Sequence, residues 1–184
     1  PEYIDKKKII ITTVASMVPV KGLEYFIKAA EKIYETNKNT SFIIAGPEIS
    51  SQKNYSKKIK SMISDREYIN YIGMCNNIPQ LLANSDLFIC SSVSEAGPIT
   101  IYEAMSMKLP VVTTDVGASR QVIENFKSGI IVPIKNSSEL FNAADKILND
   151  NVLRENFINT AFIFSKNFLS LDKITKQYIE FYNS

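Results

Sequence analysis

Two acidic residues, Glu95 and Glu103, stand eight positions apart near the middle of the chain. Between them a helix is expected to begin at Pro98, because proline suits the first helical position. The free N–H groups and the dipole at a helix start attract anions, above all phosphate. Carboxylates on either side would repel phosphate but accept hydrogen bonds from sugar hydroxyls. A ligand with hydroxyl-rich ends around a diphosphate, such as a nucleotide sugar, satisfies all these features.

The same two glutamates also have a purely structural explanation. Single acidic residues near helix starts are common, so Glu95 would be a helix N-terminal acid and Glu103 a solvated helix residue. On these two residues alone, the structural explanation is the more economical one.

A cation is available elsewhere in the chain. Lys21 follows the first apolar run and precedes a helix, which is a suitable place for an ammonium group that meets phosphate. In isolation, a solvated loop lysine is the better explanation.

Alternating strands and helices position these residues. Strands are expected at 9–14, 41–45, 68–72, 86–90, 111–112 and 129–132, and helices at 23–34, 55–63, 79–83, 98–105, 140–148, 151–164 and 170–182. This order predicts an α/β fold, a doubly wound parallel sheet with helices on both faces, in one domain spanning 1–184. Glu95 then lies at the carboxyl end of a strand, where ligands bind in such sheets. Ser137 or Ser138 is the expected N-cap of the helix at 140–148.

Composition narrows the classes of function. Of the 184 residues, 45% are hydrophobic and 22% charged, as in an ordinary globular protein, and the net charge of +2 argues against nucleic-acid binding. The chain has no histidine, which removes Ser-His-Asp and Cys-His catalysis and most zinc sites. Cys75 and Cys90 lack metal-ligand spacing and are expected to be buried free thiols in a reducing compartment. No G-x-G-x-x-G follows the first strand, which argues against a nicotinamide or flavin enzyme, and no apolar run of membrane-spanning length is present.

The order of motifs carries a resemblance. The pattern consists of E-x7-E from Glu95 to Glu103, then Ala104-Met105, Pro110-Val111-Val112, Asp115 and Gly117. It resembles the donor-site signature of family 4 retaining glycosyltransferases, which have the two-domain GT-B fold. The resemblance runs from about Ile9 to Tyr182 and corresponds to the C-terminal, donor-binding half of that family. It implies that residues 1–184 form the nucleotide-sugar domain and that an N-terminal acceptor domain is absent from this chain.

The resemblance implies a role for each matching residue. Glu95 and Lys21 would be catalytic, with Glu95 holding hydroxyls of the transferred sugar and Lys21 binding the donor diphosphate. Glu103 would accept hydrogen bonds from the ribose. The substrate-binding positions also include the backbone N–H groups of Gly97, Ile99 and Thr100, which would meet the diphosphate, and Gly73 and Met74, which would cover the nucleobase.

This chain departs from the family pattern at three positions. Ser16 stands where an arginine usually contributes to the diphosphate site, and a serine supplies one neutral hydrogen bond instead of a charged fork. Ala118 and Gln121 stand where a second glycine and a glutamate are usual.

The implied activity is sugar transfer from a nucleotide-diphosphate sugar to a glycan or lipid-linked acceptor, with retention of configuration. The resemblance implies no metal or other cofactor, no protein nucleophile, and a cytoplasmic location that is at most peripheral to the membrane. This chain alone would bind donor weakly and transfer nothing at a useful rate, because half of the cleft is missing. Two alternatives remain open: a non-catalytic nucleotide-sugar-binding module with a decayed phosphate site, and a GT-B-type epimerase, which would need further acid–base groups.

Overall fold

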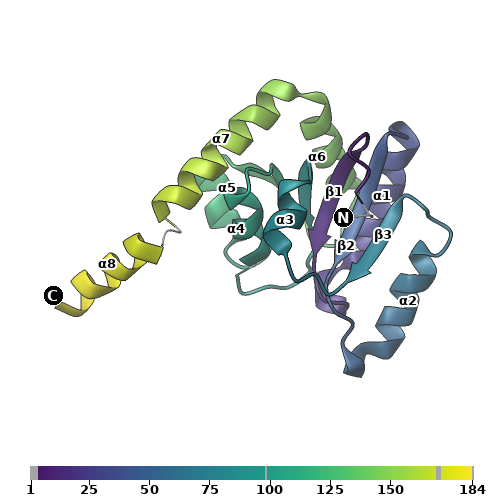
Figure 1. Cartoon of the computed structure of the whole chain (residues 1–184), viewed down its shortest axis with the longest axis horizontal. Helices are drawn as coiled ribbons and strands as arrows, with labels where there is room; N and C mark the ends of the chain where they lie inside the picture. Colours follow the sequence, from purple (N-terminus) through teal and green to yellow (C-terminus); the bar gives the residue numbers. More distant parts are fainter. Residues whose placement is uncertain (1–3, 98, 169–170, 184) are drawn as a thin grey trace.

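The structure is a computed structural model that describes residues 4–97, 99–168 and 171–183. It contains one six-stranded sheet in the order β3-β2-β1-β4-β5-β6 (Figure 1). All neighbouring strands pair in parallel. The strands are β1 (Ile9–Val14), β2 (Thr40–Ala45), β3 (Ile69–Gly73), β4 (Leu87–Cys90), β5 (Val111–Thr114) and β6 (Gly129–Val132). The predicted parallel sheet is confirmed.

Helices cover both faces of the sheet, as predicted. They are α1 (Leu23–Thr36), α2 (Lys53–Ile63), α3 (Ile78–Ala83), α4 (Ile99–Ser106), α5 (Ser119–Phe126), α6 (Ser137–Asn149), α7 (Asn151–Phe168) and α8 (Leu171–Asn183), with short 3-10 turns η1 (Pro19–Lys21) and η2 (Ser50–Gln52). One core cluster joins the sheet to α1, α2 and α6. A second cluster joins it to α3, α4 and α5 and includes residues of α7. Helix α7 contacts both α4 and α6, so it ties the two helical layers together.

The central strand β4 has buried side chains on both of its faces, so helices must cover both faces of the sheet. Leu87 and Ile89 pack in the cluster with α1 and α6, whereas Phe88 and Cys90 pack in the cluster with α4. All four side chains are buried. A strand buried on both faces reads as a continuous apolar run, and this is the pattern that identified it in the sequence.

Some local features differ from the sequence-based expectation. Helix α5 was not predicted, because among its described side chains Val122 and Ile123 are the two in the core cluster, and two adjacent residues make no helical stripe. The N-cap of α6 is Asn136, whose side chain accepts from the Glu139 N–H at 3.1 Å, so the expectation of Ser137 or Ser138 is wrong. The chain offers three capping residues in a row at this point, and the first of them makes the bond.

The cysteine expectation holds for one residue. Cys90 is buried, but Cys75 is only partly buried in the loop after β3. Pro98 lies outside the described residues, and the helix expected there is described from Ile99 onward.

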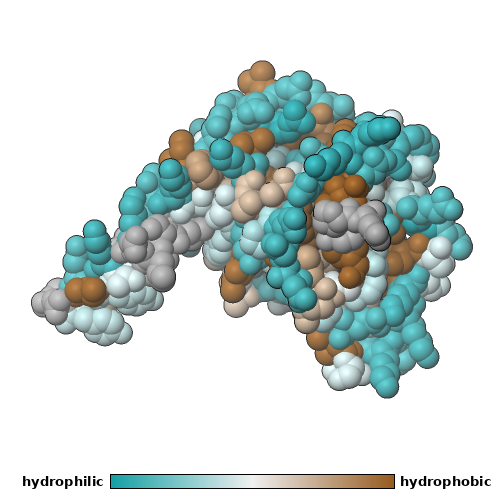
Figure 2. Space-filling model, viewed as in Figure 1, coloured by the Kyte–Doolittle hydropathy of each residue, from teal (hydrophilic) through white to brown (hydrophobic). Residues whose placement is uncertain are grey.

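The C-terminal helix α8 projects from the end of α7, away from the sheet (Figure 1). Its exposed apolar residues include Tyr178, Ile179, Phe181 and Tyr182, which are 54–78% exposed. In Figure 2 hydrophilic and apolar surface are mixed on the visible face of the body, and the end of the chain that carries α8 reaches clear of it. None of the described helices is long and apolar enough to span a bilayer.

Candidate functional site

The sheet changes direction between β1 and β4. The chain adds β2 and β3 on one side of β1 and then crosses to place β4 on its other side. The loops after these two strands, 15–22 and 91–97, leave the same carboxyl edge and meet there, where the Val93 N–H donates to the Val20 carbonyl at 2.8 Å. In doubly wound sheets this switch point is the place where ligands bind.

Lys21 and Glu95 come together across this switch point. The Lys21 Nζ forms an ion pair with Glu95 Oε1, and the two side chains are 26% and 15% exposed. The same Oε1 also accepts from the Ser92 hydroxyl at 2.9 Å. Ser92 is buried and its own carbonyl accepts from Thr114 Oγ1 at 2.5 Å, so the carboxylate is held from the sheet side. A cation and an acid that are far apart in the sequence thus form one charged centre.

Gly22 allows the two loops to approach so closely. It has φ +59°, and a Cβ at this position would lie 2.3 Å from the Ser91 carbonyl oxygen. The Ser91 hydroxyl also donates to the Lys21 carbonyl at 3.1 Å. The start of α1 is therefore pressed directly against the end of β4, and only glycine fits there.

The loop after β5 forms the next wall of the site. Gly117 has φ +49°, and a Cβ there would lie 2.3 Å from the carbonyl oxygen of Ala96. The Ala118 N–H donates to that same carbonyl at 3.3 Å. The segments 115–118 and 94–97 are therefore packed backbone to backbone.

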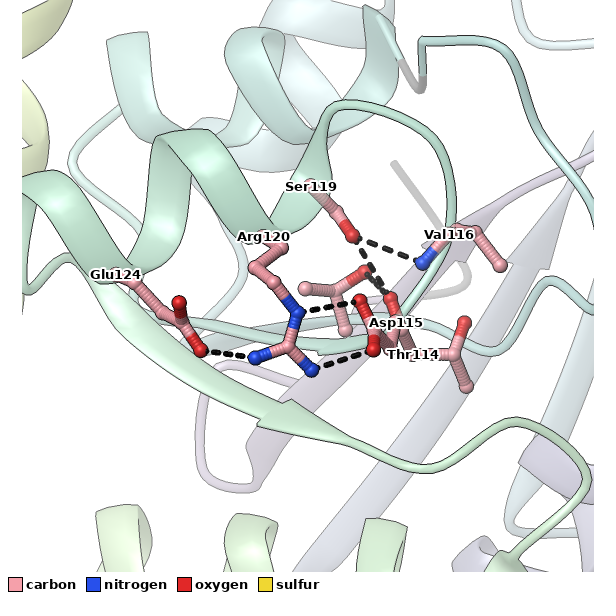
Figure 3. Close-up of polar contacts among 7 residues, drawn as sticks. Thr114, Asp115, Val116, Ser119, Arg120 and Glu124 are labelled. Atoms are coloured by element: carbon pink, nitrogen blue, oxygen red, sulfur yellow. Dashed lines mark hydrogen bonds and ion pairs between the residues drawn. The ribbon is translucent and has the colours of Figure 1, made fainter.

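A hydroxyl and a guanidinium hold this loop from the side of α5 (Figure 3). Ser119 Oγ donates to the Thr114 carbonyl and accepts from the Val116 N–H, both at 3.0 Å. Arg120 pairs with both carboxylate oxygens of Asp115 and keeps the pKa of that exposed acid below its usual value through the hydrogen bond and the charge. The loop is thus fixed before any ligand arrives.

Glu103 lies on α4, on the side that faces α3. Its carboxylate makes no hydrogen bond or ion pair with any residue that the structure describes. The side chain is exposed at the surface, and partial desolvation by the atoms packed beside it raises its pKa above the usual value. It borders a groove of about 280 Å³ whose lining residues are Pro79, Leu82, Tyr102, Glu103, Ser106 and Met107. Glu103 is therefore an exposed acid at the edge of a groove, with free acceptor positions that suit a ligand bringing hydroxyl donors.

The start of α4 faces the open side of the site. Gly97 and Ile99 are exposed, and a Cβ at Gly97 would meet no atom of the described chain within 4 Å. The first residues of α4, Ile99 and Thr100, carry N–H groups without partners inside the helix. An anion can approach this end of the helix.

The remaining predicted residues lie along the same edge of the sheet. Ser16 is half-buried in the loop after β1. Gly73 ends β3 with φ +68°, its carbonyl accepts from the Gly46 N–H at 2.8 Å, and the adjacent Met74 is 68% exposed. None of these three contacts Lys21 or Glu95 through a hydrogen bond among the described residues, so direct contact within the predicted set is limited to the Lys21–Glu95 pair.

Sequence reasoning missed Ser92, which supplies the second hydrogen bond to Glu95. The available signal is its position three residues before an acid in a polar loop that directly follows a buried strand. A serine there can bond a neighbouring acceptor locally. No three His, Cys, Asp or Glu side chains of the described chain gather as ligands for a metal ion.

The strand order and the charged switch point define a Rossmann-like α/β domain of the kind found in GT-B glycosyltransferases. The chain belongs to the group 1 glycosyl transferases, whose family model matches residues 1–163.

Curated relatives support this assignment. Alpha-D-kanosaminyltransferase of Streptomyces kanamyceticus is 30% identical over 83% of this chain and 39% of its own length. The Escherichia coli UDP-Gal:alpha-D-GlcNAc-diphosphoundecaprenol alpha-1,3-galactosyltransferase is 27% identical over 96% of this chain and 47% of its own length. The chain therefore spans less than half the length of these relatives.

Solved structures show the same fold. The Anabaena protein HepE in complex with UDP matches with a TM-score of 0.89 at 22% identity, over 96% of this chain and 49% of that one. The C-terminal domain of the group 1 protein LpcC from Francisella tularensis matches with a TM-score of 0.81 at 21% identity, over 89% of this chain and 87% of that one.

Proposed function

We propose that this chain is the donor-binding half of a retaining glycosyltransferase that moves a sugar from a nucleotide-diphosphate sugar to a glycan or lipid-linked acceptor. The observation that carries the proposal is the Lys21–Glu95 pair at the switch point, beside the open start of α4. The names of the relatives agree with it: the Escherichia coli enzyme uses a UDP-linked sugar and a diphosphoundecaprenol acceptor. The HepE structure was solved with UDP.

In this proposal, different residues of the site bind the diphosphate, the sugar and the nucleoside of the donor. Lys21 and the N–H groups of Gly97, Ile99 and Thr100 stabilise the charge that develops on the leaving diphosphate. Glu95 accepts hydrogen bonds from the sugar. The cation at the diphosphate is Lys21 rather than a metal ion, so transfer is expected to continue after treatment with a chelator.

Two further groups receive the nucleoside. Glu103 accepts hydrogen bonds from the ribose hydroxyls, and the backbone at Gly73 and Met74 covers the nucleobase. No residue is assigned as a nucleophile, because retention in this proposal proceeds on the donor face without a covalent intermediate on the protein.

The acceptor would be held by a second domain that faces this edge of the sheet. Closing the two halves over the donor would exclude water and position the acceptor hydroxyl. We place the reaction in the cytoplasm, with membrane contact at most peripheral and made by the acceptor half.

The first test is nucleotide binding by the Glu103→Ala variant. We expect the protein to bind one of UDP, GDP and ADP, and the variant to lose about 10- to 100-fold in affinity, because charge-assisted hydrogen bonds to the ribose disappear. Calorimetric titration with the three nucleotides measures this. Glu139→Ala, an exposed acid in the first turn of α6, is the control and should bind like the wild type. Equal affinity of Glu103→Ala and wild type for the same nucleotide would contradict the assignment.

Below the raised pKa of Glu103, nucleotide binding should also release a proton. Burial raises the pKa of Glu103 in the free protein, and hydroxyl donors favour its ionised form, so binding lowers that pKa. Affinity is therefore expected to be full above the raised pKa and to fall below it, approaching about tenfold per pH unit. Titrations in two buffers of different ionisation enthalpy count the released protons. A Glu103→Gln variant should lose this pH dependence, and an unchanged profile in that variant would assign the proton to another group.

A further inference from the structure

The Lys21–Glu95 pair contains a conflict, because Lys21 is proposed to bind the diphosphate and Glu95 the sugar, yet the two side chains bind each other. Glu95 Oε1 accepts from both Lys21 Nζ and the Ser92 hydroxyl, whereas no described residue donates to Oε2. Lys21 is the cation that the diphosphate would use, yet it already forms an ion pair with Glu95. The ligand must therefore compete with a carboxylate for its own counter-ion.

This arrangement treats a complete donor and a bare nucleoside diphosphate differently. A complete donor brings sugar hydroxyls that donate to Glu95. These hydrogen bonds offset the loss of the ion pair between Glu95 and Lys21. A nucleoside diphosphate keeps its ribose hydroxyls but has none on the far side of the β-phosphate, and it carries an additional negative charge at the position where the sugar was attached. Like charges at close range in a partly buried site are unfavourable.

We propose that Glu95 is a specificity-determining residue that weakens the binding of the nucleoside diphosphate product by holding Lys21 in an ion pair. The inference rests on the proposed function and adds to it a means of releasing product. When the sugar has left, Glu95 loses its hydroxyl partners and competes again for Lys21. Ser92 keeps hold of Oε1 throughout, so the carboxylate remains beside Lys21 while the lysine changes partners.

The geometry favours an effect through Lys21 over a general effect of negative charge. The pair is 26% and 15% exposed, so solvent screens it less than it screens the exposed pair of Arg120 and Glu124, in which both side chains are 54% exposed. Glu95 is also fixed by a hydrogen bond from a buried serine, which limits its movement out of the site. Removing its charge therefore frees Lys21 without creating an isolated buried charge of the opposite sign in the bound state.

The test is titration of the protein with UDP, GDP and ADP, followed by the best-binding nucleotide with Glu95→Gln, Lys21→Met and the double variant. Glu95→Gln is expected to bind the nucleoside diphosphate about fivefold more tightly or better, although it removes a residue of the site. The gain should shrink in the Lys21→Met background, where no cation remains to be freed. Glu124→Gln removes the same charge from an exposed pair and is expected to change the affinity by less than about twofold.

The outcomes separate the two proposals. Unchanged or weaker binding by Glu95→Gln overturns the inference, and so does an equal gain with and without Lys21, which would show general repulsion instead. If Glu103→Ala lowers the affinity in the same experiment, the donor site itself stands. If the wild-type protein binds none of the three nucleotides, the proposed function fails and the inference fails with it. Thermal unfolding of each variant shows whether an altered affinity reflects loss of the fold.

Discussion

Replacing Lys21 by methionine is expected to lower sugar transfer by the intact protein about 100- to 1,000-fold, the range found when a preorganised charge stabiliser is removed from an active site. Methionine keeps most of the apolar stem and removes the ammonium group. The loss should be large because, in the proposed site, Ser16 offers the diphosphate a neutral hydroxyl and adds no second positive charge. Donor turnover and nucleotide titration together measure the effect.

The matched control for this variant is Lys57→Met. Lys57 is exposed on α2, and its replacement removes the same charge away from the switch point. It should leave both turnover and affinity within about twofold of the wild type, since exposed charges contribute little. If Lys21→Met also retained turnover within that range, the diphosphate would have to be stabilised elsewhere, and the roles assigned to this edge of the sheet would be wrong.

The fold was predictable because burial on both sides leaves an unmistakable pattern. Leu87–Cys90 is apolar without alternation, and Ile9–Val14 begins with three isoleucines and is likewise buried without alternation, while the helices between them carry stripes at helical spacing. Helix α5 was missed because the core residues among its described side chains, Val122 and Ile123, are adjacent and show no helical period. Local pattern predicts an element only when the element buries enough side chains to show a period.

The site was predictable in its members but not in its contacts. Lys21 and Glu95 are 74 residues apart, and their meeting depends on β4 lying beside β1, which no local pattern specifies. Ser92 lies only three residues before Glu95, so its bond is local, but it was missed because that spacing indicates a bond only when the direction of the Glu95 side chain is known. For Glu103 the sequence predicted the position on α4. That its carboxylate has no partner among the described residues can be seen only in the structure.

Gly22 is the position where a single added methyl group should do the most damage to the fold of the site. The Cβ of Gly22→Ala would lie 2.3 Å from the Ser91 carbonyl oxygen and 3.1 Å from the Tyr25 ring. The oxygen belongs to the backbone at the end of a central strand, so relief requires a shift of β4 or of the start of α1. The residue also has φ +59°, where an alanine is strained by about 1–2 kcal/mol. With the clash added, we expect a loss of about 3 kcal/mol or more in the free energy of unfolding.

Gly73→Ala separates the clash from the strain. Gly73 has φ +68°, close to that of Gly22, but a Cβ there would meet no described atom within 4 Å. It should cost only the conformational strain, about 1–2 kcal/mol in urea or thermal unfolding. Gly22→Ala should in addition weaken nucleotide binding, because the same contact holds Lys21 against the loop that carries Glu95. Equal losses of stability in the two variants would show that the loops can move apart at little cost, and the close approach at the switch point would then not be what fixes the charged centre.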